Sequence, residues 1–427
     1  MVQGAIDTPI TGFSAKDLKI SPAEKTVLRD LAKRVAKIAE SRRMDDTRRL
    51  WKDHNSLKKT RPVVFCDPEN GWNEIVTEKQ MKCSGKISRR WEINLRKEIF
   101  WGEEMGDDKP VDPVFNVTYT VSPDDWGVEA VYHKTDQLGS YVWENPIKDY
   151  KTDLKKIHTP DFTIDWETTD GCLDLASEIF GDILTVRLKG LWWWSLGLTL
   201  PLATLRGLCN MMYDFIDHPD EIKELMSIIS RGLIDKLDYL ENQGLLSLNN
   251  DGTYVGSGGF GYTDGLPSGD YTGDVRCIDM WGFTESQETV NVSPAMYEEF
   301  IFPYEKPIME RFGLNCYGCC EPVHSRWHII KNHPRLRRVS CSAWVDKEKM
   351  AEFLENKYIF SYKPNPAILA TPVIDRETIR KEIRRLFEIT KECRVEILMK
   401  DNHTIGGRPE NVIEWCRIAR EEAENLA

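Results

Sequence analysis

The chain has 427 residues, of which 41% are hydrophobic and 30% are charged, and its net charge is −12 at pH 7. This composition suits a folded protein with a large core and excludes a disordered or fibrous chain. No long basic block is present, so we expect no nucleic-acid partner. Eleven cysteines form no regular framework, and the N-terminus lacks the basic head and apolar core of a signal peptide. These features predict a cytoplasmic protein.

The first 110 residues predict a mainly helical extension or cap. Ser21-Pro22-Ala23-Glu24 is a typical helix start, with a capping serine, a proline in the first position and a glutamate that completes the capping box. Apolar residues then recur on one helical face as far as Ala39. Further helices are expected over 42–51 and 88–101, with a polar loop over 52–60. We expect no chemistry from this region.

From residue 111 onward, strand-like and helix-like runs follow one another. The strands are expected at 114–121, 184–188, 245–248, 276–280, 314–317, 338–341, 358–362 and 395–399. The helices are expected at 220–243, 293–312, 347–356, 376–392 and 409–425. Strands that alternate with helices pair in parallel, and eight of them predict a (β/α)8 TIM barrel over 111–427. An open doubly wound sheet is the alternative.

Two segments need separate interpretation. Residues 190–205 are the most apolar stretch, but they are shorter than the roughly 20 residues that span a bilayer and they contain Pro201. We expect a buried wall there rather than a membrane anchor. The glycines of 256–261 lead into Tyr262 and Pro267 instead of a helix, so they predict a flexible loop and not a phosphate cradle.

A barrel carries its active site on the loops that follow the carboxyl ends of its strands. Glu285 follows one apolar strand, where burial would raise its pKa and make it a proton donor. Lys363 follows another strand, in a loop shaped by prolines, where it could bind an anionic group or act as an acid. We take these two as the catalytic candidates. The substrate-binding candidates at the other strand ends are Asn249, Asp251, Tyr317 and Trp344.

Ligands suited to zinc gather in two of these loops. Cys319, Cys320, Glu321 and His324 stand in one loop and His403 in the other. Thiolate, imidazole and carboxylate are the ligand set of Zn²⁺. The pattern alone favours the alternative, a set of buried, inert cysteines and surface histidines. If a metal is bound, two-residue alternation favours Cys319 with Glu321.

The order of several motifs resembles the uroporphyrinogen decarboxylase superfamily over about residues 110–427. The matching segments are Leu205-Arg206-Gly207-Leu208, His218-Pro219-Asp220-Glu221, Ser293-Pro294, Gly318-Cys319-Cys320, Lys363-Pro364-Asn365-Pro366 and Gly406-Gly407-Arg408-Pro409. The N-terminal segment, with Leu50-Trp51-Lys52 and Thr60-Arg61-Pro62, looks like a long-chain subgroup found in anaerobes.

The resemblance implies one of two chemistries. The decarboxylases grip substrate carboxylates with an Arg-Gln-Ala-Gly-Arg run, which this chain lacks. The methyltransferases carry a His-x-Cys zinc motif and a late cysteine. Here Cys319 stands on the cysteine position, Tyr317 replaces the histidine and His403 lies near the late cysteine. The resemblance therefore implies a zinc site formed by Cys319, Glu321 and His403, with an altered ligand set.

From the resemblance we expect a zinc-dependent methyltransferase that moves a methyl group between a small methylated donor and a corrinoid protein. The most specific form of this expectation is O-demethylation of a methoxylated aromatic compound. The alternatives are a decarboxylase-like lyase, a methyltransferase that uses a tetrahydrofolate or thiol acceptor, and a corrinoid- or tetrapyrrole-binding protein without catalysis. The expected partners are the corrinoid protein and the methyl donor. We expect no membrane association. The oligomeric state is not predicted, and a homodimer is one possibility.

Overall fold

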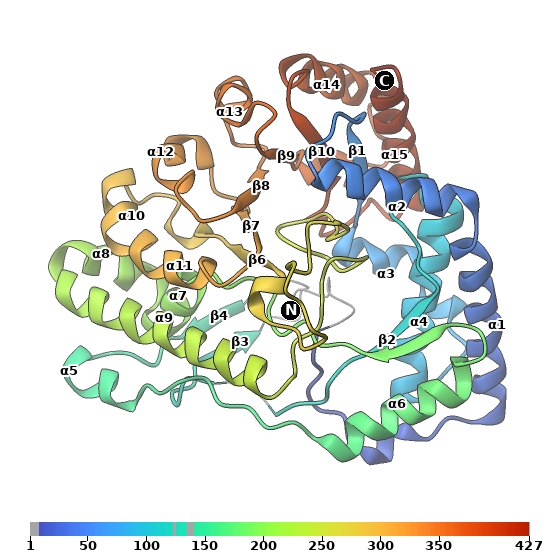
Figure 1. Cartoon of the computed structure of the whole chain (residues 1–427), viewed down its shortest axis with the longest axis horizontal. Coiled ribbons are helices and arrows are strands. Elements are labelled where there is room, and N and C mark those ends of the chain that lie inside the picture. The colour runs from blue at the N-terminus through green and yellow to red at the C-terminus, as the bar shows by residue number, and fades with distance from the viewer. Residues whose placement is uncertain (1–7, 123–124, 135–140, 427) are drawn as a thin grey trace.

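The computed structural model describes residues 8–122, 125–134 and 141–426, and its helices are arranged around the strands (Figure 1). The strands are β1 (Val63–Cys66), β2 (Val114–Val117), β3 (Val131–Lys134), β4 (Tyr141–Glu144), β5 (Thr185–Leu188), β6 (Trp281–Thr284), β7 (Leu314–Tyr317), β8 (Leu336–Cys341), β9 (Ile359–Tyr362) and β10 (Arg394–Met399).

The larger helices of the first half are α1 (Pro22–Ala39), α2 (Arg42–Asn55), α4 (Lys86–Phe100), α6 (Trp166–Phe180), α7 (Thr199–Arg206), α8 (Leu208–Asp217) and α9 (Pro219–Asn242). Those of the second half are α10 (Pro294–Phe300), α11 (Phe302–Met309), α13 (Lys347–Leu354), α14 (Arg376–Ile389) and α15 (Pro409–Glu424). Single turns form α3 (Trp72–Ile75), α5 (Tyr150–Asp153) and α12 (Trp327–Ile330). No helix among the described residues is long and apolar enough to cross a membrane.

Six strands form one parallel sheet in the order β1-β10-β9-β8-β7-β6. The first strand of the chain thus lies beside the last, with Val63 opposite Glu396. A second, two-stranded sheet pairs β2 with β5 in parallel, and β3 with β4 forms an antiparallel hairpin. The chain is therefore an α/β protein with a mainly parallel sheet. In the described part of the chain, no ladder joins the two parallel sheets.

The gap between β5 and β6 is filled by the chain after α9. Gly190 N donates to Ser247 Oγ at 3.2 Å, and the Asn249 side chain bonds both backbone groups of Trp281, at 2.8 and 3.0 Å. The prediction of a strand at 245–248 is therefore wrong. The segment lies where a strand would join β5 to β6, but it forms no ladder. Side chains make the joining hydrogen bonds there, so no backbone ladder forms.

The strand predicted at 276–280 is also wrong. Residues Cys277–Asp279 form a short 3₁₀ turn, because the Asp279 carboxylate accepts from the Arg276 backbone N–H at 3.1 Å and from its guanidinium at 2.9 Å. The strand begins later, as β6. The helix predicted over 293–312 is divided at Ile301 into α10 and α11, where Pro303 opens the second helix.

The N-terminal segment is mainly helical, but it also supplies β1 to the six-stranded sheet. Its helix α2 continues to Asn55, beyond the predicted end, and buries His54 and Asn55. His54 Nε2 lies 3.2 Å from Glu396 Oε2, and Glu396 pairs in turn with Arg338 at 2.8 Å. A buried polar network therefore ties α2 to β8 and β10.

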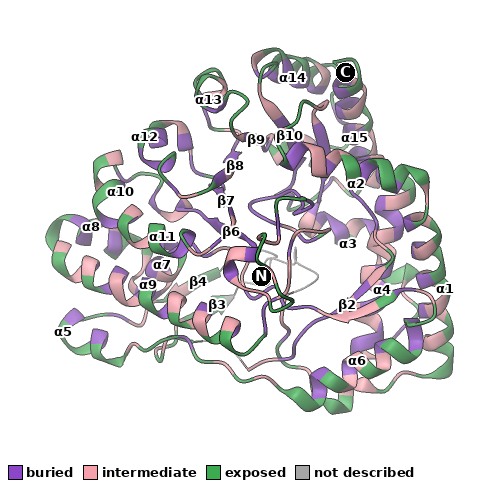
Figure 2. Cartoon of the chain, viewed as in Figure 1, coloured by how far each residue is buried: buried purple, intermediate pink, exposed green. Residues whose placement is uncertain are grey.

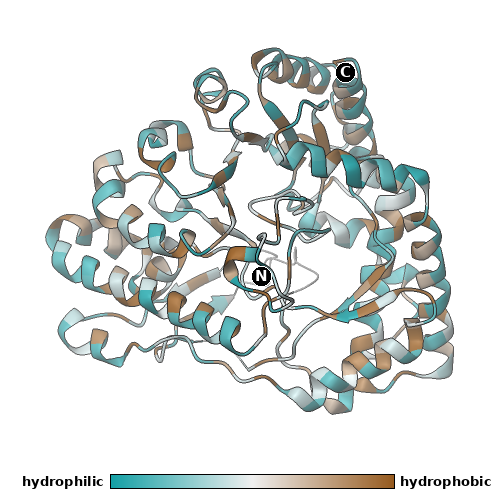
Figure 3. Ribbon diagram, viewed as in Figure 1, coloured by the Kyte–Doolittle hydropathy of each residue, from teal (hydrophilic) through white to brown (hydrophobic). Residues whose placement is uncertain are grey.

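The core follows the sheet, with buried strands and helices that expose their outer faces (Figure 2). Hydrophilic residues alternate with hydrophobic ones along the helices, as expected for helices with one buried stripe (Figure 3). Residues 190–205 are confirmed as a buried wall, since Leu191, Trp192, Leu196 and Leu198 are all buried.

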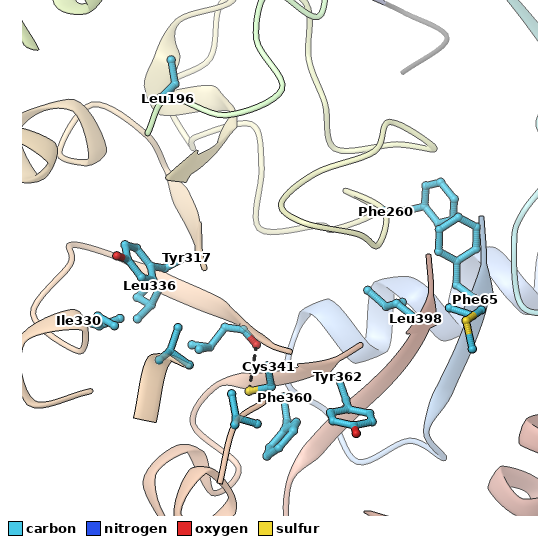
Figure 4. Close-up of a cluster of buried hydrophobic side chains, with 14 of the residues drawn as sticks. Phe65, Leu196, Phe260, Tyr317, Ile330, Leu336, Cys341, Phe360, Tyr362 and Leu398 are labelled. Atoms are coloured by element: carbon cyan, nitrogen blue, oxygen red, sulfur yellow. Dashed lines mark hydrogen bonds between the residues drawn. The ribbon is translucent and has the colours of Figure 1, made fainter. Parts of the chain in front are cut away.

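The glycine-rich segment 256–261 is buried throughout, so the flexible loop predicted there is wrong. Gly256, Gly258 and Gly259 have positive φ, which lets the backbone turn inside the core. Phe260 then packs on Phe65 of β1 with ring centroids 4.8 Å apart (Figure 4). The segment is an internal plug against the sheet, and we call residues 256–261 the glycine plug.

Candidate active site at the carboxyl edge of the sheet

Reactive side chains follow the carboxyl ends of the sheet strands. Each is placed by the strand before it, because parallel strands bring their carboxyl ends to one edge. Those that are buried or half-buried are Glu69 after β1, Glu285 and Glu288 after β6, Cys319 and Glu321 after β7, Lys363 after β9, and Lys400 and Asp401 after β10. Cys320, also after β7, is exposed.

Lys363 and two cysteines form the centre of this edge. Lys363 Nζ lies 3.4 Å from Cys319 Sγ and 3.9 Å from Cys320 Sγ, and the two sulfurs are 3.7 Å apart. Ser257 of the glycine plug accepts from Lys363 Nζ at 2.7 Å and donates to Cys319 Sγ at 3.2 Å. Lys363 and Cys319 are buried, whereas Cys320 is exposed. Gly318, at φ +93°, makes the turn that brings the thiols to the lysine.

The two thiols are made unequal by their surroundings. The hydrogen bond with Cys319 lowers the pKa of Cys320, and the nearby Lys363 ammonium lowers it further. The same bond and burial raise the pKa of Cys319 well above its usual range. Although burial opposes its charge, Lys363 has a raised pKa because of Cys319 and Asp401. The cluster therefore favours an ammonium beside a thiolate on Cys320.

A second buried lysine lies next to the first. Lys400 Nζ contacts Tyr254 Oη and Glu69 Oε1, each at 3.1 Å. Asp401 lies between the two ammonium groups, 3.7 Å from Lys363 and 3.9 Å from Lys400. Burial works against the charge of Lys400, but Tyr254 and Glu69 raise its pKa well above the usual range. Both cations are thus compensated by acidic groups.

Three glutamates gather beside the thiols. Glu285 is fully buried, accepting from Ser195 Oγ at 3.2 Å and from Gln287 N at 3.0 Å. Burial and the neighbouring charges of Glu288 and Glu321 raise its pKa well above the usual range. Burial also raises the pKa of Glu288, with a contribution from Glu321. Glu285 and Glu288 therefore form a carboxyl pair that retains a proton at pH values where an exposed glutamate loses it.

A hollow of about 580 Å³ opens next to Glu288 and Cys320. Its walls come from α8 and from the loop after β6. The lining residues are Leu208, Cys209, Met212, Tyr213, Gln287, Glu288, Val290, Asn291 and Cys320. Its volume suits a small organic molecule. We call this cavity the α8 hollow.

The predicted substrate-binding residues do not line the α8 hollow. Asn249 is buried and its amide is used by the Trp281 backbone. Asp251 is held by Lys189 and Arg187 at 2.8 and 2.6 Å, which lower its pKa although burial opposes this. Tyr317 is fully buried and stacks on His333, with ring centroids 4.8 Å apart. Trp344 is 72% exposed, at the turn after β8.

The residues predicted to bind zinc do not fit a zinc site. Both Glu321 oxygens accept backbone N–H groups, from Ser286 at 3.0 Å and Cys319 at 2.9 Å. Cys319 is bonded to Lys363, and His403 is exposed. Within the part of the chain that the structure describes, no three His, Cys, Asp or Glu side chains are grouped as a metal would require. We therefore derive no chemical step through zinc, and zinc binding by these residues stays a prediction.

Several residues of this site were not among the predicted site residues. The metal hypothesis prefers Cys319 to Cys320, and the glycine run that contains Ser257 is predicted as a flexible loop. Glu288 and Lys400 follow strands in the same way as Glu285 and Lys363, so the strand-end rule alone could have selected them.

The sequence matches no protein-family model and no curated protein. Among solved structures, a methyltransferase from Methanosarcina mazei is similar to this chain at 11% sequence identity and a TM-score of 0.49. The comparison covers 88% of this chain and 97% of that one. The function is therefore argued from the site.

Proposed function

We propose that this chain transfers a methyl group from a methoxylated aromatic donor to a corrinoid protein. The observation that carries the proposal is the carboxyl pair Glu285–Glu288 beside the α8 hollow, where burial raises the pKa of both carboxyl groups and so favours their protonated forms. The motif resemblance supports a corrinoid acceptor. We also propose a (β/α)8 scaffold, which the six-stranded and two-stranded parallel sheets of the described residues support.

The chemistry demands an acid because an ether oxygen is a poor leaving group. The acceptor supplies an electron pair to the methyl carbon, and the bond between that carbon and the ether oxygen breaks toward oxygen. Glu288, which lines the α8 hollow, gives its proton to the departing oxygen. Glu285 is fully buried, and burial raises its pKa, with a further rise from the neighbouring charges of Glu288 and Glu321.

The test is methyl transfer with purified protein, 2-methoxyphenol and a reduced corrinoid protein, followed by the change in corrinoid absorption. We expect Glu288→Gln to lower the rate by about 10²–10⁴-fold, the range for a lost general acid. Glu352→Gln, on the exposed face of α13, is the matched control and should keep the wild-type rate.

Two outcomes would refute the proposal. One is an unchanged rate in Glu288→Gln. The other is the release of carbon dioxide from a carboxylated tetrapyrrole by a protein that transfers no methyl group in either direction, which would establish the lyase.

A further inference from the structure

The α8 hollow has walls suited to an aromatic ring. Leu208, Met212 and Tyr213 line it from α8, and Val290 closes it from the loop after β6. Tyr213 is 69% exposed and Val290 is 44% exposed, so apolar surface faces the empty space. A ring placed there would remove this surface from water, which favours binding.

The described lining of the α8 hollow contains no positively charged residue. Glu288 is its one acidic side chain other than the two thiols, and none of the lining residues is a lysine, arginine or histidine. The polar remainder, Gln287, Asn291 and two thiols, carries no fixed positive charge. An anionic ligand would therefore find no counter-ion among these residues, which is costly in a partly desolvated cavity.

The basic side chains near the lining residues are already hydrogen-bonded to other groups. Lys363 is buried beneath the thiols and bonded to Ser257. Arg206 pairs with Asp214, with Nε and Oδ2 2.5 Å apart. Arg326 is buried and donates to the Val292 carbonyl at 2.7 Å. None of these cations can turn into the hollow without breaking an existing bond.

We infer that the donor taken by the α8 hollow is an uncharged aryl methyl ether and that carboxylated aryl ethers are excluded. This inference rests on the proposed function and adds the substrate class. The uncharged ring contacts Met212 and Tyr213. Its ether oxygen accepts a hydrogen bond from protonated Glu288, whereas a carboxylate on the ring would have no positively charged partner among the lining residues.

Two probes that differ by one carboxylate test the inference. We would measure binding of 2-methoxyphenol and of 4-hydroxy-3-methoxybenzoate to the full chain by calorimetry at pH 7, without any acceptor. We expect 2-methoxyphenol to bind at least tenfold more tightly. Equal or tighter binding of the benzoate, or no binding of 2-methoxyphenol up to its solubility limit, would overturn the inference.

Two surface variants locate the binding. Val290→Trp fills the hollow from an exposed loop and should abolish binding of 2-methoxyphenol. Asn291→Arg adds the missing cation at an exposed rim position and should strengthen benzoate binding by about tenfold, with little change for 2-methoxyphenol. Circular dichroism checks that both variants fold. Unchanged binding in Val290→Trp would place the ligand elsewhere and overturn the inference.

The inference and the proposed function fail in distinguishable ways. A protein that binds 2-methoxyphenol in the hollow but methylates no corrinoid protein would refute the proposed function and leave the charge preference intact. A protein that uses only the benzoate as its donor would refute the charge preference and leave methyl transfer intact.

Discussion

At the scale of single residues, the reactive edge depends on one buried ammonium that serves two sulfurs. Lys363 contacts both Cys319 and Cys320, but only Cys320 faces solvent. Positive charge beside a thiol stabilises its thiolate, which is the form that reacts with alkylating agents. The rate at which Cys320 reacts therefore depends on the positive charge of Lys363.

Replacing the ammonium should slow that reaction. We expect Lys363→Met to lower the rate of Cys320 alkylation by iodoacetamide at pH 7 by about tenfold, since a rise of one pKa unit reduces the thiolate fraction tenfold. Mass spectrometry of the modified peptides measures the rate. Cys209 of α8 lines the same hollow and is the internal control, whose rate should stay constant.

The buried Glu285 should make stability depend on pH. Its pKa is raised well above 4.5 in the folded state, so the folded protein holds a proton that the unfolded chain releases. The resulting stability is complete below about pH 4.5 and is lost as the pH rises toward the folded pKa. Between pH 5 and pH 8, wild type should lose about 1–3 kcal/mol more than Glu285→Gln. Urea unfolding at the two pH values measures this difference.

The comparison variant for that experiment is Glu352→Gln, which removes an exposed carboxylate from α13. Its unfolding free energy should follow wild type at both pH values. If Glu285→Gln loses as much stability as wild type over this range, Glu285 does not retain a proton in the folded state.

Site residues were predictable where a true strand precedes them. Glu285, Cys319 and Lys363 follow β6, β7 and β9, and the carboxyl-end rule brings them to one edge. Asn249 follows a segment without a ladder, and its amide bonds Trp281 instead. His403 is exposed beyond Asp401, where a φ of +62° turns the chain. Neither the missing ladder nor this turn is visible in residue types.

At the scale of elements, the glycine plug is the least expected feature. A glycine-rich run with no helix behind it is typical of a mobile loop, yet here it fills the interior beside β1, β7 and β10. Its backbone approaches other segments of the chain so closely that a side chain would not fit. A Cβ on Gly258 would lie 2.6 Å from Leu398 Cδ1. Sequence composition alone does not distinguish glycine used for mobility from glycine used for close packing.

This packing gives a stability prediction with a matched control. Gly258→Ala combines a φ of +138° with that steric contact, so we expect a loss of about 2–4 kcal/mol in the free energy of unfolding. Gly269→Ala, in the loop that follows, meets no atom within 4 Å and should change stability by less than about 0.5 kcal/mol. Equal stability of the two variants would show that the plug is not packed.

Elements with their own local signals were predicted well. The strand β7 was placed with its observed bounds, and the serine-proline cap placed the start of α1. β1 was missed because four buried residues, Val63–Cys66, form a run too short to distinguish from the end of a loop. Only the pairing with β10 identifies it as a strand, and that partner lies at the other end of the chain.

At the scale of the whole molecule, the first 110 residues are joined to the rest through the sheet and the polar network around Glu396. The division predicted at residue 110 can be tested by expressing 111–427 alone. We expect this fragment to be insoluble or to unfold without cooperativity, since it would expose the β10 edge and leave Arg338–Glu396 without His54. A fragment with a sharp thermal transition would show that the two parts fold independently.

The pairing of β1 with β10 also affects how the protein is made. His54 and Glu396 are in contact although they are 342 positions apart in the chain. During synthesis, β1 leaves the ribosome long before β10 has been made. The apolar surface of β1 therefore stays unpaired until the last strand is available. Contacts of such long range slow folding and prolong the exposure of unpaired edges. Growth temperature and chaperone supply should therefore limit the yield of soluble protein more than the final stability does.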